Sequence, residues 1–405
     1  MDLYSGQPWW IIKNAMCNYY NPLKMNIRKR VAIIGSGITG ALVAHELCEA
    51  GIDCCVVDKR SVSTGSSVAS TALLQYEIDL PLYKMAELMP EENAVAAYRA
   101  CLESINDLEN LLRKARVDAD FQRVPSVYYA SNHKGMREIE REYKIRTEYG
   151  FPVKMLKRKE LKTLMGIDAP GALINDASAQ VDTYKASTGL LLRHMKKDKL
   201  EVYTHTEITE WNRLGNGYIL KTAEGNVIAC DYVVVAAGFE AGPFLPEKRM
   251  ELTTTFAVIS QPVDKKYIWY GNSLIWETRE PYLYIRTDDT NRIIVGGEDI
   301  PYNNTVARKF LLDRKAEVLE KKFRKLFPDI PFTTEMTWAG TFSSTKDGLP
   351  LIGPVSSDPR MLYALGYGGN GITFSVIAAQ VLTRYIQKKK DRLAHIFSLE
   401  RDSLK

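Results

Sequence analysis

Residues 31–60, VAIIGSGITGALVAHELCEAGIDCCVVDKR, join two apolar runs through a glycine-rich turn and a helical segment. Val31–Ile34 is predicted to be a buried strand, Ala41–Cys48 a helix and Cys54–Val57 the next strand. Gly51 follows the helix as its terminating residue. The turn contains Gly35, Gly37 and Gly40. This order of elements predicts a βαβ unit in a parallel sheet.

The spacing of the glycines is typical of a dinucleotide-binding turn. Gly35 permits a tight turn, Gly37 removes the Cβ that would keep a diphosphate from the backbone, and Gly40 lets the helix approach the sheet. The N–H groups at the helix start then face negative charge. Asp58 ends the next strand, where its carboxylate can accept a hydrogen bond from a ribose 2′-hydroxyl and disfavours a 2′-phosphate. A glycine turn that only joins a strand to a helix is the alternative.

Length and composition favour a soluble protein of two lobes. The chain has 405 residues, of which 45% are hydrophobic and 25% charged, and its net charge is +5. Because the lysines and arginines are dispersed, we expect no nucleic-acid partner, and Lys388–Lys390 is interpreted as a solvated helix end. Charged residues and glycines interrupt the apolar stretch Val31–Ile52, so we expect no stable membrane insertion. Residues 1–16 do not resemble a signal peptide.

The reactive side chains exclude several function classes. Six cysteines lack CxxC spacing, which favours a reducing compartment, and we expect a cytoplasmic protein. Five scattered histidines show no carboxylate cluster beside them, so no metal site is predicted. The chain has no G-x-S-x-G elbow, and nothing favours serine hydrolase chemistry. The cysteines are Cys17, Cys48, Cys54, Cys55, Cys101 and Cys230, and the histidines are His45, His133, His194, His205 and His395.

The rest of the chain alternates helical and strand patterns. Helices are predicted within 84–116 and at 134–149, 183–196, 306–327 and 371–388. Strands are predicted at 124–130, 200–203, 208–213, 218–222 and 232–236, and an antiparallel sheet at 253–261, 273–277, 281–286 and 292–295, with a turn at Gly296–Gly297. The predicted fold class is α/β. A Rossmann-type nucleotide domain, residues 1–80, 176–247 and 336–405, carries an inserted α+β domain on an antiparallel sheet, residues 81–175 and 248–335.

Ordered motifs from Val31 to about Ile386 resemble the FAD-dependent amine and amino-acid oxidoreductases of the D-amino-acid oxidase type. That family includes glycine oxidase, sarcosine oxidase and gamma-glutamylputrescine oxidase. Besides the opening turn, the resemblance rests on Asp58–Arg60, Thr64–Ser67, Gln180–Asp182, Val233–Gly238, Trp338–Gly340, Asp347–Gly353 and the loop Gly366–Phe374 (GYGGNGITF).

The resemblance implies a non-covalently bound FAD. No Cys lies near Ser343–Thr345, where sarcosine oxidase attaches its flavin. A glycine-rich turn at a helix start can present N–H groups to the flavin pyrimidine edge, although a plain helix-flanking loop would also need glycines. The implied cofactor residues are Gly35, Ser36, Gly37, Ile38, Thr39, Gly40, Asp58, Lys59, Arg60, Thr64, Gly65, Ser66, Ser67, Thr71, Ala72, Leu73, Ile208, Ala237, Gly238, Gly348, Gly369, Asn370, Gly371, Ile372 and Thr373.

The resemblance also implies the reaction. One dinucleotide fingerprint is visible, so the electrons should come from a substrate held over the flavin rather than from NAD(P)H. The expected chemistry is hydride transfer from a carbon bonded to nitrogen in a small amine or N-substituted amino acid, with oxygen or another acceptor taking the electrons. An NAD-dependent dehydrogenase and a non-catalytic nucleotide-bound scaffold are the alternatives.

Three residues are candidates for the substrate site. Tyr284 and Arg286 share one face of the predicted strand, so Tyr284 could orient an amine and Arg286 an anionic group. A solvent-facing or lobe-bridging Arg286 is an equal alternative. Thr373 stands where sarcosine oxidase has a lysine, and Phe342 where glycine oxidase has a carboxylate-binding arginine. A simple α-amino acid substrate is therefore not assured.

Overall fold

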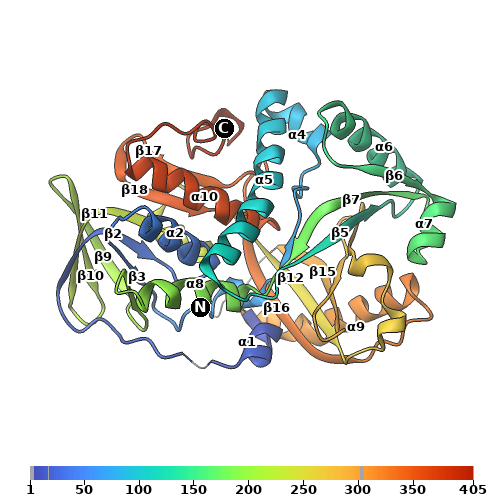
Figure 1. Ribbon diagram of the computed structural model, residues 1–405, viewed down its shortest axis with the longest axis horizontal. Coiled ribbons are helices and arrows are strands. Elements are labelled where there is room, and N and C mark those ends of the chain that lie inside the picture. The colour runs from blue at the N-terminus through green and yellow to red at the C-terminus, as the bar shows by residue number, and fades with distance from the viewer. Residues whose placement is uncertain (1–3, 17, 302–304, 405) are drawn as a thin grey trace.

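The computed structural model describes residues 4–16, 18–301 and 305–404, which form one sheet of eight strands and another of ten. Figure 1 shows the eight-stranded sheet at the left and the ten-stranded sheet at the right, with helix α5 (Glu91–Ala115) between them. The α/β class and the predicted βαβ unit are thereby confirmed.

The eight-stranded sheet has the order β17-β18-β11-β2-β3-β8, with β10 pairing both β11 and β9. Strands β18, β11, β2, β3 and β8 are parallel, and β17 is antiparallel to β18. The bounds are β2 Ile27–Ile34, β3 Cys54–Val57, β8 Leu200–Tyr203, β9 Ile208–Leu214, β10 Gly217–Thr222, β11 Val227–Val235, β17 Leu351–Val355 and β18 Asp358–Leu365.

Both faces of this sheet are covered, which explains its nearly continuous apolar strands. Val31 and Cys54 belong to the core under helices α2 (Ile38–Glu49), α8 (Thr183–Met195) and α10 (Gly371–Ile386), whereas Ala32 and Cys55 belong to the core on the other face. The prediction that Cys54 and Cys55 point to opposite faces is confirmed.

The ten-stranded sheet has the order β1-β16-β12-β15-β14-β13-β5-β7-β4, and β6 also pairs β7. It is antiparallel except where β13 runs parallel to β5. The strands are β1 Tyr4–Gly6, β4 Leu73–Leu74, β5 Gln122–Tyr129, β6 Lys154–Lys157, β7 Gly171–Gln180, β12 Glu251–Ser260, β13 Leu274–Glu277, β14 Tyr284–Thr287, β15 Ile293–Pro301 and β16 Thr334–Ser344. The remaining helices are α1 Trp9–Asn14, α3 Ser66–Ala69, α4 Leu82–Leu88, α6 His133–Glu148, α7 Arg158–Met165 and α9 Thr305–Leu326, with 3-10 turns at Gly238–Phe244, Lys265–Tyr267, Tyr270–Asn272 and Asp402–Leu404.

One strand differs from the sequence prediction in a way that matters for the site. The prediction of a turn at Gly296–Gly297 is wrong, because β15 continues through both glycines to Pro301. The strand bulges there: Thr254 pairs with Ile300, but Phe256 already pairs with Gly297. Two residues of β15 thus oppose Thr255 alone, which changes the face to which the following side chain points.

Strand pairing also refines the domain boundaries. Strands β1 and β16 belong to the ten-stranded sheet, although residues 1–80 and 336–405 were assigned to the nucleotide domain. We propose that both segments cross between the two domains, with β1, β4 and β16 completing the second one.

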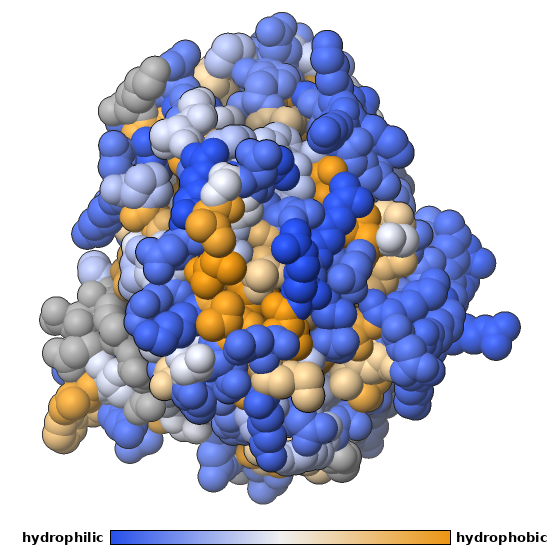
Figure 2. Space-filling view, turned by 90° about the vertical axis from the view of Figure 1, so that its left-hand side faces the viewer, coloured by the Kyte–Doolittle hydropathy of each residue, from blue (hydrophilic) through white to orange (hydrophobic). Residues whose placement is uncertain are grey.

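Figure 2 shows the face of the molecule that lies at the left of Figure 1. Most of that face is hydrophilic, and hydrophobic side chains gather in one hollowed strip near its middle. None of the helices in the described part of the chain combines the length and the apolar content that a bilayer crossing needs.

Candidate active site

A cavity lies between the two domains, and both contribute its walls. The eight-stranded sheet contributes the turn after β2, residues 58–60 after β3 and residues 206–208. The ten-stranded sheet contributes Thr255, Trp276, Tyr284 and Asp299. Residues 65–73 and the loop 366–372 complete the wall.

The first glycine turn, residues 35–40, is shaped by contacts that only glycine permits. A Cβ on Gly35, whose φ is +110°, would lie 2.4 Å from the carbonyl oxygen of Ala236. A Cβ on Gly40 would lie 1.9 Å from the Gly35 oxygen, so the helix could not pack so closely. At Gly37 a Cβ would lie 2.8 Å from Ser67 Oγ, beside the cavity. The three glycines thus have the local geometry that their spacing predicted.

Asp58 is fixed at the end of β3 by three hydrogen bonds. Its Oδ2 accepts from the Ser36 N–H at 2.8 Å and the Ser36 hydroxyl at 2.7 Å, and its Oδ1 accepts from the Arg60 N–H at 2.9 Å. The neighbouring cations are paired: Arg60 Nη1 lies 2.6 Å from Glu240, and Lys59 Nζ lies 3.1 Å from it. This end of the cavity therefore carries a carboxylate fixed by hydrogen bonds and binds its own cations internally.

Arg286, for which the sequence left substrate binding and lobe bridging equally open, is not among the described residues that line the cavity. The side chain is 2% exposed, and Nη1 donates to the carbonyl oxygens of Thr71, Ala72 and Val181 at 2.9–3.2 Å. Burial lowers the pKa of the Arg286 guanidinium to about 10. It lies farther along β14 than Tyr284, beneath the 71–73 wall. The lobe-bridging alternative describes its position, because its donors join β14 to the segments before β4 and α8.

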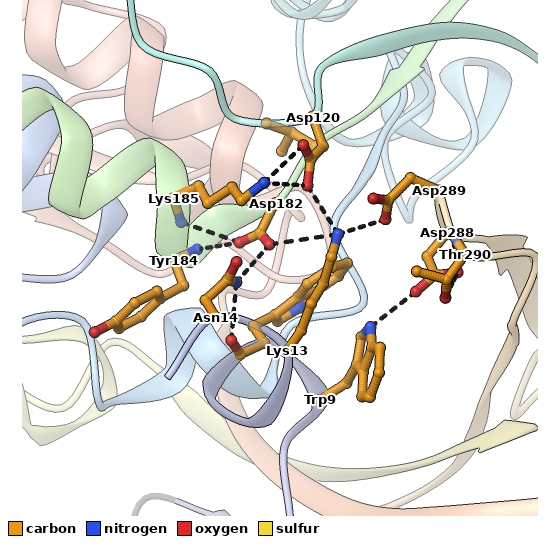
Figure 3. A network of polar contacts seen from close by, with 12 residues as sticks. Trp9, Lys13, Asn14, Asp120, Asp182, Tyr184, Lys185, Asp288, Asp289 and Thr290 are labelled. Carbon is orange, nitrogen blue, oxygen red and sulfur yellow. Dashed lines mark hydrogen bonds and ion pairs between the residues drawn. The ribbon is translucent and has the colours of Figure 1, made fainter. Parts of the chain in front are cut away.

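Helix α1 packs beside this buried arginine, whose guanidinium carbon lies 5.2 Å from the centre of the Trp10 ring. Figure 3 shows the polar network around the helix. Lys13 contacts Asp120 at 2.8 Å and also contacts Asp289. Asn14 donates to Asp182, which in turn caps the start of α8. The N-terminal helix is thereby tied to segments from both domains.

Five further residues predicted at the cofactor lie behind the cavity wall. Thr373, also proposed as catalytic, is 3% exposed inside α10 and donates to the Asn370 oxygen at 2.9 Å, so it turns away from the cavity. Thr64 donates to the Ser61 oxygen, and Gly348 packs against Leu80. Ser36 and Gly40 act from behind the wall through the contacts given above.

The other predicted residues do line the cavity. They are Gly35, Gly37, Ile38, Thr39, Asp58, Lys59, Arg60, Gly65, Ser66, Ser67, Thr71, Ala72, Leu73, Ile208, Ala237, Gly238, Tyr284, Gly369, Asn370, Gly371 and Ile372. Their individual roles toward a cofactor stay predictions.

The last glycine loop, residues 366–371, surrounds a carboxylate that sequence reasoning missed. The Gly369 N–H donates to Asp79 Oδ2 at 2.6 Å. A Cβ on Gly368 or Gly369 would lie 2.7 or 2.6 Å from an Asp79 oxygen. Asn370 does not cap α10 with its side chain, so the N–H groups of Gly371 and Ile372 stay at the open helix start beside the cavity.

The wall of the second domain is aromatic and acidic. The Tyr282 hydroxyl donates to Asp79 Oδ1 at 3.1 Å, and the Tyr284 hydroxyl lies 2.8 Å from Thr255 Oγ1. Gly296 leaves room for the Tyr284 ring, which a Cβ would approach to 2.1 Å. Asp299 follows the β15 bulge and faces the cavity. The Gly296–Gly297 pair was the signal that could have predicted this bulge.

Two histidines are not scattered, as the sequence suggested. His45 Nδ1 of α2 and His194 Nε2 of α8 lie 2.9 Å apart, and Glu49 Oε1 lies 3.9 Å from His194. Burial lowers the pKa of each imidazole to about 4, so both are neutral at pH 7. The direct contact between the rings shows an internal hydrogen bond between the two helices, away from the cavity wall.

Comparison with known proteins relates the whole chain to flavoenzymes. A family model described as FAD dependent oxidoreductase matches residues 30–385. Glycine oxidase from Geobacillus kaustophilus (strain HTA426) is 22% identical over 385 residues, covering 90% of this chain and 95% of that protein. Gamma-glutamylputrescine oxidoreductase from Escherichia coli (strain K12) is 23% identical over 393 residues, covering 93% and 89%.

Solved structures share the fold. The crystal structure of glycine oxidase from Geobacillus kaustophilus has a TM-score of 0.76 at 20% identity and covers 92% of this chain and 99% of that chain. Reduced L-α-glycerophosphate oxidase from Mycoplasma pneumoniae, with FAD bound, has a TM-score of 0.77 at 17% identity and covers 90% and 97%. The cavity between the two domains therefore lies in a fold that is known to hold FAD.

Proposed function

This chain belongs to the FAD-dependent oxidoreductase family, and on that premise we propose that it oxidises a C–N bond of a small amine or N-substituted amino acid. The observation that carries the proposal is a cavity between two domains. Its wall contains two glycine-rich turns, residues 35–40 and 366–371, which lead into helices α2 and α10. The family match gives no support to the NAD-dependent alternative.

The residues of the cavity fit FAD. A Cβ on Gly37 would press on Ser67 Oγ, and Gly37 is the residue before α2, whose helix start suits a diphosphate, with the Ile38 N–H donating to Ser67 Oγ at 2.9 Å. Asp58 offers acceptors to the adenosine ribose, and its neighbouring cations are paired with Glu240. The N–H groups of Gly371 and Ile372 suit the pyrimidine edge of the ring. When bound, FAD supplies the acceptor for two electrons.

In this proposal the second domain holds the substrate. Tyr282 and Tyr284 form a wall that orients an amine and excludes water, and burial raises the pKa of both phenols, which stay protonated. Arg286 is a positioning residue that holds Thr71 and Ala72 against the cofactor from behind. Thr373 has no direct part, because its hydroxyl is used inside α10.

The partners follow from the same proposal. A small amine enters the cavity, and oxygen or another acceptor takes the electrons. We also propose a cytoplasmic protein, supported by free, buried cysteines such as Cys48 and Cys54, whose sulfurs lie 3.8 Å apart without a bond.

Anaerobic mixing of the purified holoenzyme with a panel of amines and amino acids tests the function. A substrate should bleach the flavin absorbance near about 450 nm, a property of the cofactor. Bound FAD that no panel member reduces would favour the scaffold alternative. A colourless protein that does not take up added FAD would refute the proposal itself.

A further inference from the structure

The charges of the cavity wall are unevenly distributed. Among the described lining residues the cations are Lys59 and Arg60, and both pair with Glu240 in the nucleotide domain. Carboxylates line the part of the wall that the second domain and the segment before α4 contribute. These are Glu77, Asp79 and Asp299.

Glu77 is already compensated within the protein. Its Oε1 accepts a hydrogen bond from the Asn175 amide at 2.5 Å and lies 3.4 Å from Nη1 of Arg146. Arg146 is fully buried and also binds Glu142 at 2.7 Å. Glu77 therefore belongs to an internal ion-pair cluster and contributes little free negative charge to the cavity.

Asp79 has neutral partners. Its two oxygens accept from the Gly369 N–H and from the Tyr282 hydroxyl. Burial raises the pKa of its carboxyl, and the charge that acts on it is the negative one of Glu280. The Asp79 side chain nevertheless lines the cavity and is exposed there. A positive ligand in the cavity would thus meet a carboxylate whose charge the protein has left uncompensated.

Asp299 is brought to the same wall by backbone geometry. Glu298 before it has a φ of +58° within the β15 bulge, a conformation that non-glycine residues rarely adopt. The bulge directs Glu298 to Lys315 and Lys322, at 2.8 and 2.5 Å, and leaves Asp299 facing the cavity. Asp299 Oδ1 is buried without a hydrogen-bond partner, and Asp79 and Glu298 raise the pKa of this carboxyl after burial, to about 6 in all.

Aromatic rings complete this wall. Tyr282 and Tyr284 lie with ring centres 5.7 Å apart, and Trp276 lines the same cavity. The faces of such rings attract ammonium groups. Phe342, also in the wall, offers no donor to an anion.

We propose that the substrate is a cationic amine without a carboxylate group, whose ammonium is recognised by Asp79 and Asp299 among the aromatic rings of Tyr282, Tyr284 and Trp276. This inference rests on the proposed function, since it names the class of amine that the same cavity oxidises. An ammonium relieves the repulsion between the two carboxylates, whereas a substrate carboxylate would add a third negative charge beside them. The cavity thereby favours a cationic amine by attraction and disfavours a substrate carboxylate by repulsion.

Two compounds that share a phenyl ring and carry opposite charges test the selection. Benzyltrimethylammonium and benzoate are titrated into the oxidised holoenzyme, and binding is followed by the change in flavin absorbance. We expect the cation to bind at least about tenfold more tightly than the anion, the effect of its ionic attraction to the carboxylates and of cation–π contact with the aromatic rings. Equal binding, or tighter binding of benzoate, would overturn the inference.

Variants assign the effect to the two carboxylates. Asp299→Asn and Asp79→Asn should each weaken binding of the cation by about tenfold and leave or strengthen binding of benzoate, at unchanged FAD content. Asp299 has no contact with the last glycine loop. If Asp79→Asn loses FAD, the Asp299→Asn variant can therefore still be tested for its preference between the two ligands. Asp176→Asn, an exposed carboxylate on β7 outside the cavity, is the control and should change neither affinity. Unchanged cation preference in Asp299→Asn would refute its role.

A matched pair of amines separates this inference from the proposed function. N-methylbenzylamine should bleach the flavin under anaerobic conditions, and N-benzylglycine, which adds a carboxylate, should not. Reduction by N-benzylglycine alone would overturn the inference and leave amine oxidation standing. Reduction by neither amine, with benzyltrimethylammonium still preferred over benzoate, would support the charge selection and count against oxidation of this amine class.

Discussion

The first and last glycine-rich turns of the cavity, residues 35–40 and 366–371, need glycine for different reasons. In the first turn, a Cβ at Gly35 or Gly40 would collide with backbone atoms of the same βαβ unit or of the strand beside it. In the last turn, a Cβ at Gly368 or Gly369 would collide with the carboxylate of Asp79, 289 or 290 residues away in the chain. The first turn is limited by backbone atoms, some as distant in the chain as Ala236, whereas the last is adapted to a side chain.

The two turns also differ in which backbone N–H groups are available to a ligand. The first turn uses the Ser36 N–H for Asp58 and the Ile38 N–H for the Ser67 hydroxyl, at 2.8 and 2.9 Å, and Gly37 adds no side-chain cap to α2. The last turn uses the Gly369 N–H for Asp79 and the Gly368 N–H for the Ser343 oxygen, so the open donors begin only at Gly371. A glycine-rich loop therefore does not by itself offer all its N–H groups to a cofactor.

The strongest way to break the first turn is Gly37→Glu. The new side chain and its charge would meet Ser67 Oγ and occupy the place proposed for the diphosphate. We expect loss of FAD, by more than about 100-fold in affinity, from the buried charge. The ratio of flavin to protein absorbance measures this. Gly242→Glu, at an exposed glycine with nothing near its Cβ position, should retain FAD, and full occupancy in Gly37→Glu would contradict the assignment.

The wall between the two turns is tested by Arg286→Met. Three carbonyl oxygens, of Thr71, Ala72 and Val181, would lose their buried donor. We expect the free energy of unfolding to fall by about 3 kcal/mol, measured by urea denaturation, with weaker FAD binding. Arg28→Met, whose side chain is 80% exposed, is the control. If Arg286→Met has normal stability but no longer oxidises amines, Arg286 would instead be assigned to the substrate site.

The contrast between the turns is sharpened by Gly369→Ala. The added methyl group would press on Asp79, and we expect a loss of about 1–3 kcal/mol in stability. The double variant Gly369→Ala with Asp79→Ala should recover part of that loss, since the colliding carboxylate is gone. Strictly additive losses in thermal or urea unfolding would show that the two residues are not coupled.

The smallest expected effect is the pH dependence contributed by Asp299. Its pKa is raised in the folded protein to about 6, so its ionisation opposes folding. Because the folded pKa lies above the unfolded one, wild type should lose stability relative to Asp299→Asn as pH rises from about 4 to about 6, by about 1 kcal/mol after solvent screening. The groups that face Asp299 are Thr255, Asp79, Glu298 and Lys315. A constant difference in urea unfolding across this pH range would show that Asp299 is not perturbed.

Much of the nucleotide domain could be predicted because its signals are local. The apolar runs at 31–34 and 54–57, the glycine spacing and Asp58 all lie within one βαβ unit, whose geometry follows from strand and helix dimensions. Within that unit the predicted cofactor residues Gly35, Gly37, Ile38, Thr39 and 58–60 line the cavity for the same reason. Thr373 and Arg286 do not line the cavity, because strand and helix periodicity gives a face but not the depth at which a side chain ends.

The sequence by itself indicated the family, FAD as the cofactor and the α/β class, since ordered motifs of short spacing carry them, and the roles of single residues toward FAD stay predictions. Only the tertiary structure decided which groups each charged side chain contacts. Asp79 reaches the last glycine loop, Asp299 turns to the cavity through a bulge, and Arg286 binds carbonyl oxygens of two distant segments. These pairings depend on long-range contacts between the domains, and no local pattern of residues encodes the distance between groups so far apart in the chain.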